Sequence, residues 1–284
     1  MDTETQTIQS AVNWGSNQLT ASSPSPKIDA EVLLCFVLEK RKTYLIAHSD
    51  DVLNVSHWET FQKLIAQRVT GVPVAYLVGK REFWDLELYV NEHTLIPRPD
   101  TETLVEQVLE LYPDATKKKA LDLGTGTGAI ALALGQEKKL WQITAVDNSA
   151  SALDVAKQNS ISNNVHNVEF ILSDWFSALD QAETFDLIVS NPPYIDPQDE
   201  HLQQGDLRFE PISALIAEES GYKDYRCILE QALGFLNVGG YVIFEHGYDQ
   251  GESLRKMMRS ANLVDVQTKQ DLGGNDRISF GRKN

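Results

Sequence analysis

The tetrapeptide Asn191-Pro192-Pro193-Tyr194 contains the residue types in this chain that are best suited to chemistry. The side-chain oxygen of Asn191 and a proline carbonyl are two acceptors, each able to take one N–H of a planar NH2 group. Two prolines stiffen the turn and remove backbone donors that would compete. The Tyr194 ring offers an apolar face on which a flat amide or base can stack. The tetrapeptide therefore predicts a site that holds a planar amino or carboxamide group.

The position of the tetrapeptide in the sequence favours this interpretation. It follows residues 185–190, an apolar run typical of a buried parallel strand. Ligands of open α/β sheets bind beyond the carboxyl ends of the strands. The alternative is a plain turn, because Asn-Pro often marks turns. A glycine-rich loop earlier in the chain makes the binding site the stronger interpretation.

That loop is the segment Gly124-Thr125-Gly126-Thr127-Gly128, which joins a predicted strand to a helix beginning at Ala129. Glycine lets the backbone turn tightly and approach a ligand closely. The spacing is ambiguous, since it fits the G-x-G-x-x-A pattern of dinucleotide-binding loops. It fits equally well the G-x-G-x-G loop of proteins that bind nucleoside sulfonium compounds. The loop predicts a cofactor site and leaves both classes of cofactor open.

Acidic residues follow the next two predicted strands. Asp147 can accept both hydroxyls of a ribose, although it is also placed to cap the following helix. Asp174 can accept the exocyclic amine of adenine, and Trp175 can line the adenine ring. The alternative for Trp175 is an ordinary core aromatic. Each of these features comes at the carboxyl end of a successive strand, so we expect the four to converge on one crevice.

The rest of the chain supplies the elements that must position these residues. Residues 1–75 predict a small helical recognition domain, with a capping box starting at Ser56, and residues 76–100 predict a hairpin and linker. Residues 101–284 alternate strands and helices, which predicts a doubly wound α/β domain. Its first helix is predicted to be capped by Asp100 or Thr101. The predicted strands are 120–123, 141–146, 168–172, 187–190 and 241–245, with a closing pair at 263–268 and 278–281.

Composition limits the classes of function. The 284 residues carry a formal net charge of −16, and such a surface disfavours broad non-specific binding to nucleic acid. Cys35 and Cys227 lie in apolar helical patterns and are predicted to be buried and reduced. The acidic segment Met1–Thr5 is unlike a signal peptide, and no apolar stretch is long enough to span a bilayer. We therefore expect a cytoplasmic protein that does not bind membranes.

Other chemistries lack their motifs in this sequence. The six histidines are scattered and no Cys-x-x-Cys pair occurs, so we expect no metal site. A phosphate-binding P-loop and a Gly-x-Ser-x-Gly nucleophile elbow are also missing. His246 follows a predicted strand and is interpreted as a structural hydrogen-bonding residue rather than a general base.

Taken in order, the glycine loop, Asp147, Asp174-Trp175 and the tetrapeptide resemble the class I S-adenosylmethionine-dependent methyltransferases. Within that class the chain resembles the bacterial release-factor glutamine N5-methyltransferases of the HemK/PrmC family. The helical first part, the connector at 96–102, and the segments at 208–211 and 244–247 carry the narrower resemblance. One departure is Asp100, where many relatives carry glutamate.

The resemblance implies a Rossmann-like methyltransferase sheet and S-adenosylmethionine as the methyl donor. Gly124 to Gly128 and Asp147 would hold the methionine and ribose parts of the cofactor, and Trp175 would lie near its adenine. Asn191 to Tyr194 would grip the glutamine of the Gly-Gly-Gln motif of peptide-chain release factors. The helical domain would help to dock the release factor. Roles for Glu102 and Glu210 at the pocket mouth stay open.

Three rival functions remain at this stage. An adenine N6-methyltransferase would use the same pocket for a flipped base, but it should carry a basic groove. A nicotinamide dehydrogenase would explain the glycine loop and not the tetrapeptide. A non-enzymatic adaptor would leave the intact tetrapeptide unexplained. The favoured hypothesis is a monomeric glutamine methyltransferase.

Overall fold

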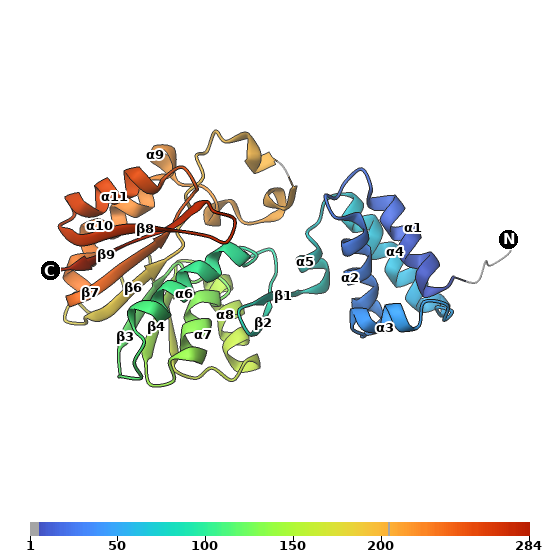
Figure 1. Cartoon of the computed structure of the whole chain (residues 1–284), viewed down its shortest axis with the longest axis horizontal. Coiled ribbons are helices and arrows are strands. Elements are labelled where there is room, and N and C mark those ends of the chain that lie inside the picture. The colour runs from blue at the N-terminus through green and yellow to red at the C-terminus, as the bar shows by residue number, and fades with distance from the viewer. Residues whose placement is uncertain (1–5, 204) are drawn as a thin grey trace. The chain divides into compact units, whose positions relative to one another are not determined.

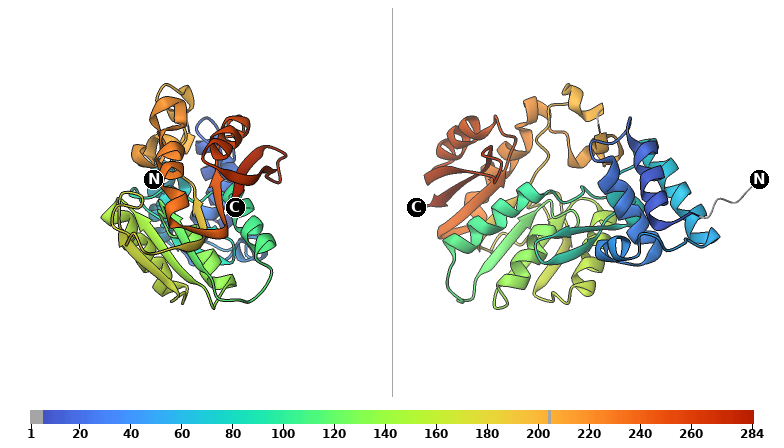
Figure 2. Two further views of the ribbon diagram at one scale, coloured as in Figure 1. Left: turned by 90° about the vertical axis from the view of Figure 1, so that its left-hand side faces the viewer. Right: turned by 45° about the vertical axis from the view of Figure 1, so that its right-hand side comes forward.

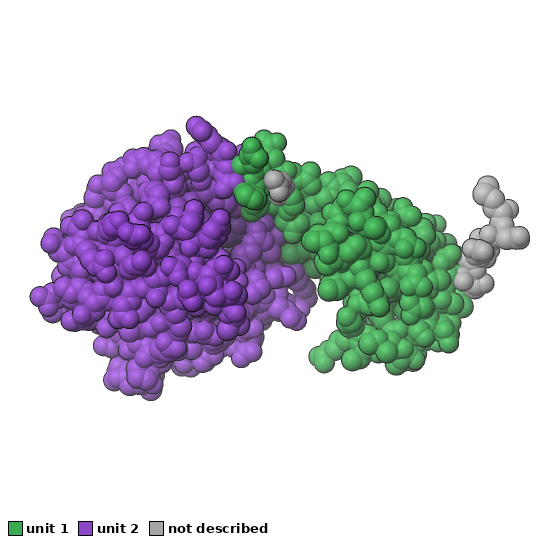
Figure 3. Space-filling model, turned by 45° about the horizontal axis from the view of Figure 1, so that its top comes forward, with its two compact units in different colours: residues 1–79, 200–209 green, residues 80–199, 210–284 purple. Residues whose placement is uncertain are grey.

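The computed structural model describes residues 6–203 and 205–284, so the acidic segment Met1–Thr5 lies outside the described residues. The chain divides into two compact units (Figure 3). One unit comprises residues 1–79 together with 200–209, and the other comprises residues 80–199 and 210–284. The segment 200–209 therefore packs with helices more than 120 positions earlier in the sequence, which no local pattern indicates.

The first unit is helical (Figure 1). Its helices are α1 (Ile8–Leu19), α2 (Pro26–Leu38), α3 (Lys42–Ala47), α4 (Val55–Val69) and α5 (Val74–Val78). Their apolar faces bury a core that includes Leu19, Leu33 and Phe61, and hydrophobic burial of this kind is the main stabilising contribution. The segment 200–209 adds two short 3-10 turns, Glu200–Gln203 and Gly205–Phe209.

The predicted capping box at Ser56 is wrong. The N-cap of α4 lies two residues earlier, at Asn54, whose side-chain oxygen accepts the backbone N–H of His57 at 2.7 Å. Asparagine is among the best N-cap residues, so the helix begins after Asn54 and not after the serine of the Ser-x-x-Glu pattern that follows.

The second unit begins with a hairpin, β1 (Lys80–Phe83) and β2 (Leu86–Tyr89), paired antiparallel. After it come the helices α6 (Glu102–Leu111), α7 (Ala129–Glu137), α8 (Ala150–Ser162), α9 (Glu218–Gly221), α10 (Lys223–Phe235) and α11 (Gly251–Ser260). The strands between them are β3 (Lys119–Leu123), β4 (Gln142–Asp147), β5 (Val168–Leu172), β6 (Phe185–Ser190), β7 (Leu236–Glu245), β8 (Leu263–Gln270) and β9 (Asp276–Lys283).

These seven strands of the described residues form one sheet in the order β5-β4-β3-β6-β7-β9-β8. The pairs from β5 to β7 are parallel, and β9 pairs antiparallel with both β7 and β8. The chain runs outward from β3 to β5 on one side and resumes with β6 on the other. Strand order therefore reverses next to β3, and ligands of doubly wound sheets bind at this point. The predicted doubly wound fold is confirmed.

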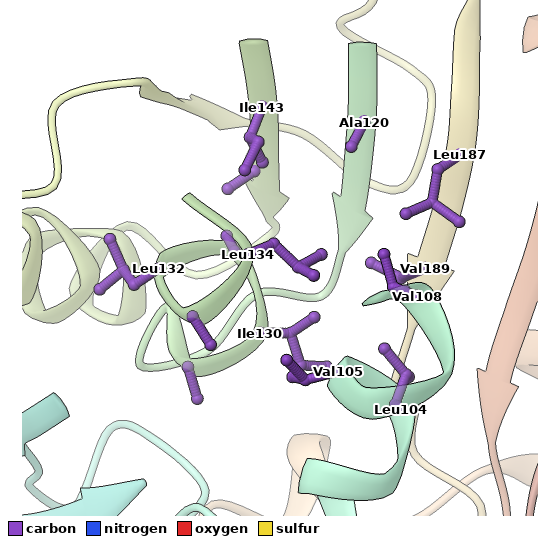
Figure 4. Close-up of a cluster of buried hydrophobic side chains, with 14 of the residues drawn as sticks. Leu104, Val105, Val108, Ala120, Ile130, Leu132, Leu134, Ile143, Leu187 and Val189 are labelled. Carbon is purple, nitrogen blue, oxygen red and sulfur yellow. The ribbon is translucent and has the colours of Figure 1, made fainter. Parts of the chain in front are cut away.

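Helices cover both faces of the sheet (Figures 1 and 2). Side chains alternate along β3, so Ala120 packs toward α6 and α7 while Leu121 packs toward α10 and α11. Figure 4 shows the first of these cores, where Leu104 and Val108 of α6 and Ile130 of α7 point at the strands. Burial on both faces explains why the parallel strands read as continuous apolar runs.

Two smaller expectations need correction. Thr101 occupies the N-cap position of α6, but its side chain makes no capping hydrogen bond, and a 3-10 turn at Pro99–Thr101 starts the helix instead. Cys35 and Cys227 are free thiols, as predicted, but both are half-buried rather than buried. None of the described helices has the length and apolar character needed to cross a membrane.

Candidate active site

A cavity of about 590 Å³ lies in the second unit, beyond the carboxyl ends of the parallel strands. This volume is in the range of cofactor and small-molecule sites. The loops after four successive strands, β3 to β6, form much of its wall. Among the predicted site residues, the cavity is lined by Gly124, Thr125, Gly126, Thr127, Asp147, Asp174, Trp175, Asn191 and Pro193.

The glycine loop after β3 owes its shape to glycines with positive φ. Gly124 and Gly126 have φ of +74° and +55°, and a Cβ on Gly126 would meet nothing within 4 Å, so its backbone faces open space. Gly128 is not among the lining residues. A Cβ there would lie 3.1 Å from the Leu132 side chain, so this glycine lets the start of α7 pack closely.

Asp147 ends β4 and is tied into the loops around it. Its two carboxylate oxygens accept the backbone N–H groups of Gly126 and Ser149, each at 2.9 Å. Burial raises the pKa of Asp147, and these hydrogen bonds oppose the rise. The helix cap is Ser149, whose hydroxyl accepts the backbone N–H of Ala152. Asp147 therefore supports the helix start from outside the cap position and also faces the cavity.

Asp122 is a buried acid under the glycine loop that sequence reasoning did not single out. Its Oδ2 accepts the Thr125 hydroxyl at 2.6 Å, and its other oxygen has no hydrogen-bond partner among the described residues. Burial raises the pKa of Asp122 to about 7, and the Thr125 hydrogen bond opposes the rise. The only feature of the sequence that could have indicated Asp122 is its position as a single acid within an apolar predicted strand.

The segment after β5 turns sharply into the cavity wall. Trp175 has a φ of +47°, and the Ser173 hydroxyl donates to its carbonyl at 2.8 Å. Positive φ is costly for a bulky residue and is seen where the surroundings enforce it. Trp175 also packs on the core below, so it is partly a core aromatic and partly cavity wall.

The tetrapeptide after β6 contributes to the cavity unevenly. Asn191 and Pro193 line it, while Pro192 is buried and Tyr194 packs against the core. The Asn191 amide donates to the Thr101 hydroxyl at a long 3.5 Å. The Tyr194 carbonyl accepts the Gln250 side chain at 3.1 Å. Stacking of the substrate amide on Tyr194 would require the Tyr194 ring to present an edge or a face to the cavity. This stacking role stays a prediction.

Two further segments line the cavity that the sequence did not mark. One is the connector after the hairpin, which contributes Glu92, His93, Thr94, Leu95, Pro97 and Arg98, and the other is the start of α10, which contributes Lys223, Asp224 and Cys227. The connector is held by the buried Glu210, which accepts the Ile96 backbone N–H at 3.2 Å and pairs with Arg98 at 2.5 Å. Pro97 and Arg98 belong to the connector at 96–102 that carries the narrower resemblance, but no local pattern in either segment predicts that the fold brings it to the site.

Comparisons with known proteins decide the family. A release factor glutamine methyltransferase of Shewanella oneidensis is 50% identical over 275 residues, which are 97% of this chain and 96% of that protein. One of the same name from Escherichia coli is 47% identical over 94% of this chain and 95% of that protein. This chain belongs to the release factor glutamine methyltransferases. The model of the PrmC N-terminal domain matches residues 10–79, and that of the methyltransferase small domain matches residues 99–207.

Solved structures agree with this fold for the release factor glutamine methyltransferase. The hMettl16 catalytic domain superposes with a TM-score of 0.57 at 19% identity, over 78% of this chain and 80% of that one. A 16S rRNA methyltransferase of T. thermophilus gives a TM-score of 0.53 at 18% identity, over 72% of this chain and 50% of that one. At these identities the likeness is evidence for the fold alone.

Two further polar residues of this methyltransferase lie outside the cavity wall. The Glu102 side chain accepts the Trp84 backbone N–H at 2.8 Å, so it joins α6 to the hairpin. His246 is buried between the Gly247 carbonyl and the Ser279 hydroxyl, and burial lowers its pKa. Neither side chain is among the residues that line the cavity.

Proposed function

We propose that this protein transfers a methyl group from S-adenosylmethionine to the side-chain nitrogen, N5, of the glutamine in the Gly-Gly-Gln motif of peptide-chain release factors. The observation that carries the proposal is the placement of Asn191 in the wall of the same cavity as the glycine loop and Asp147. The choice of substrate is supported by the 50% sequence identity, over 97% of this chain, with a protein named release factor glutamine methyltransferase.

The residues around the cavity fit the cofactor. Open backbone at Gly126 leaves room for the methionine part, and the Asp147 carboxylate offers oxygens to the ribose hydroxyls. Asp174 and Trp175 would contact the adenine from the loop after β5. Bound there, S-adenosylmethionine supplies an electrophilic methyl group on a positively charged sulfur.

The protein must make the amide nitrogen of the substrate reactive, because the methyl group of the cofactor is already electrophilic. An amide nitrogen is a poor nucleophile because its lone pair is delocalised into the carbonyl. Asn191 and the Pro192 carbonyl would accept its two N–H bonds, which fixes the nitrogen and favours a more pyramidal geometry. The same acceptors stabilise the positive charge that grows on nitrogen during attack. Holding the two reactants in this geometry removes much of the entropic barrier.

Proton removal needs no dedicated base. The N-alkylated amide is strongly acidic and can lose its extra proton to water once transfer is complete. We propose that Tyr194 keeps the amide plane aligned by stacking, with Pro193 closing the wall beside it. In this scheme Asn191, Pro192 and Tyr194 are the catalytic residues, and Pro193 binds the substrate with them. The cofactor is held by the glycine loop at 124–128, Asp147, Asp174 and Trp175, with a further contact from Asn191.

A peptide-chain release factor is a protein that acts on ribosomes, so we place the reaction in the cytoplasm. The formal charge of −16 favours a protein partner over stable binding to nucleic acid. We also propose that the enzyme works as a monomer, with the helical unit of residues 1–79 contributing to release-factor docking.

Methyl transfer from labelled S-adenosylmethionine tests the function. Purified release factor should be labelled, whereas DNA, RNA and a release factor with the Gly-Gly-Gln glutamine changed to alanine should not. Labelling of nucleic acid in place of release factor would identify an adenine methyltransferase. Competition between NADH and S-adenosylhomocysteine for the cavity would identify a dehydrogenase if NADH bound more tightly.

A further inference from the structure

Glu245 is a buried acid beside Asn191 that the mechanism above does not use. It ends β7 and is 1% exposed. In the parallel pair of β6 and β7, Ser190 is in register with Phe244. The next residues along these strands, Asn191 and Glu245, therefore come side by side. The Thr101 and Asn191 side chains lie beside the Glu245 carboxyl group and favour its ionised form, so they oppose the rise of its pKa that burial causes.

This arrangement determines which end of the Asn191 amide faces the cavity. A carboxylate can only accept hydrogen bonds, so it selects the orientation in which the amide Nδ2 points at it. Thr101 is placed to accept from the same nitrogen, at 3.5 Å. With Nδ2 engaged on that side, Oδ1 is the end left for a ligand in the cavity that Asn191 lines.

A purely structural role explains Glu245 poorly. Its Oε2 atom is buried and has no hydrogen-bond partner among the described residues. Leaving a carboxylate oxygen unpaired in the interior costs free energy. An apolar side chain of similar size would avoid that cost. An unsatisfied buried group that contacts a candidate catalytic side chain indicates a functional reason for its presence.

We propose that Glu245 is a positioning residue that holds the Asn191 amide with its oxygen toward the substrate nitrogen. This rests on the proposed function, because the orientation matters only if Asn191 accepts an N–H from the substrate. Donation from Nδ2 to a carboxylate also polarises the amide, so Oδ1 becomes a stronger acceptor as positive charge grows on the nitrogen. Loss of Glu245 should therefore slow transfer and leave cofactor binding intact.

The protonation state of Glu245 provides a distinctive readout. Burial raises its pKa to about 7, and the Thr101 hydrogen bond and the positive charge of Arg277 oppose the rise. The charged or titratable groups that act on it are Arg277 of β9, Asp100 of the turn before α6, Tyr194 after β6 and Tyr225 of α10. A protonated Glu245 can donate a hydrogen bond to Oδ1 of Asn191. It therefore also stabilises the reversed orientation of the amide, in which Nδ2 faces the cavity. We expect kcat to rise as pH increases through about 7.

The test compares kcat, KM and the affinity for S-adenosylhomocysteine across this pH range in the full chain. Glu245→Gln, which both donates and accepts, should lower kcat at least about tenfold above pH 7. The same variant should remove the rise with pH while changing KM and cofactor affinity little. Glu245→Asp should retain the rise. Thr101→Val is a second variant with an expected fall in kcat, in case Glu245→Gln does not fold.

Ser279→Ala is the matched control, because it breaks a buried hydrogen bond from β9 to His246, the residue after Glu245, and does not alter a partner of Asn191. It should keep the wild-type pH profile. A Glu245→Gln enzyme with wild-type kcat and pH profile would overturn the positioning role, as would an equal loss of the profile in Ser279→Ala. A wild-type protein that binds S-adenosylhomocysteine but methylates no release factor would instead overturn the proposed function, and this role with it.

Discussion

Asp147 accepts a hydrogen bond from the backbone N–H of Gly126 at 2.9 Å. This bond joins the end of β4 to the glycine loop after β3, across 21 positions of sequence. The acid that is expected to hold the ribose therefore also fixes the loop expected to hold the methionine part. The Asp147 side chain thus stabilises the conformation of the glycine loop and also places a negative charge in the site.

Replacing Asp147 with alanine should weaken cofactor binding. The variant loses the ribose acceptors and the bond to Gly126, so we expect the affinity for S-adenosylhomocysteine to fall about tenfold to a hundredfold, equivalent to about 1–3 kcal/mol. Isothermal calorimetry measures this directly. Asp154→Ala removes an exposed carboxylate from the neighbouring helix α8 and should bind normally. Unchanged affinity in Asp147→Ala would mean that the ribose lies elsewhere.

Replacing Asn191 with alanine should separate binding from chemistry. The side chain accepts a substrate N–H in the proposed mechanism, whereas Asp147 and the glycine loop supply most of the proposed cofactor contacts. We expect kcat to fall at least about a hundredfold, the usual cost of removing one preorganised group that stabilises developing charge. Cofactor affinity, measured by calorimetry, should change little. Near-normal turnover would exclude the catalytic role of Asn191.

Asp122 should make stability depend on pH. Its pKa is raised from 3.8 to about 7 in the folded chain, so between these values the unfolded chain releases a proton that the folded chain keeps. The free energy of unfolding should therefore fall as pH rises from about 4 to about 7, and then level off. The difference in pKa corresponds to about 4 kcal/mol.

Asp122→Asn isolates this contribution, because asparagine does not titrate. Urea unfolding of the variant and the wild type should give free energies whose difference grows in favour of the variant between about pH 4 and pH 7. If the two curves ran parallel over that range, the pKa of Asp122 would not be raised in the folded protein.

Arg68 should hold the helical unit together. Its guanidinium is buried and pairs with Asp29 at 2.8 Å and with Asp206 of the segment 200–209 at 3.1 Å. Arg68→Met leaves Asp29 buried without its charge partner, and we expect a loss of about 3–5 kcal/mol in urea unfolding. Cleavage by trypsin at Arg208 should become faster. Asp206→Asn, which removes only the half-exposed partner, should cost about 1 kcal/mol or less. Equal stability of the two variants would contradict this.

Much of the fold follows from periodicity, because buried parallel strands are apolar on both faces. The run at 185–190 and the loop at 124–128 could be placed from the sequence for this reason. Their positions at strand ends also predicted that Asp147 and Asn191 would reach one cavity. Local rules failed where two signals competed, as at α4, where Asn54 and the Ser56 pattern lie two positions apart.

Other parts of the site depend on contacts that the sequence does not encode locally. The proposed role of Glu245 could not be predicted locally, because it depends on the register of β6 and β7. That register places Glu245 beside Asn191, which lies 54 positions earlier in the chain. The connector near Glu92 and the start of α10 line the cavity only because the fold returns them to the switch point. Segment 200–209 packs on the helical unit through Arg68, and no periodic pattern marks such an ion pair.

In the proposed reaction the cavity presents a carboxamide nitrogen to the methyl group of S-adenosylmethionine. The most direct measurement is tandem mass spectrometry of a release factor after incubation with the enzyme and the cofactor. We predict one added methyl group on the side-chain nitrogen of the Gly-Gly-Gln glutamine, and none with Asn191→Ala. A methyl group on another residue, or an unmodified release factor in the presence of enzyme that binds the cofactor, would contradict the proposed reaction.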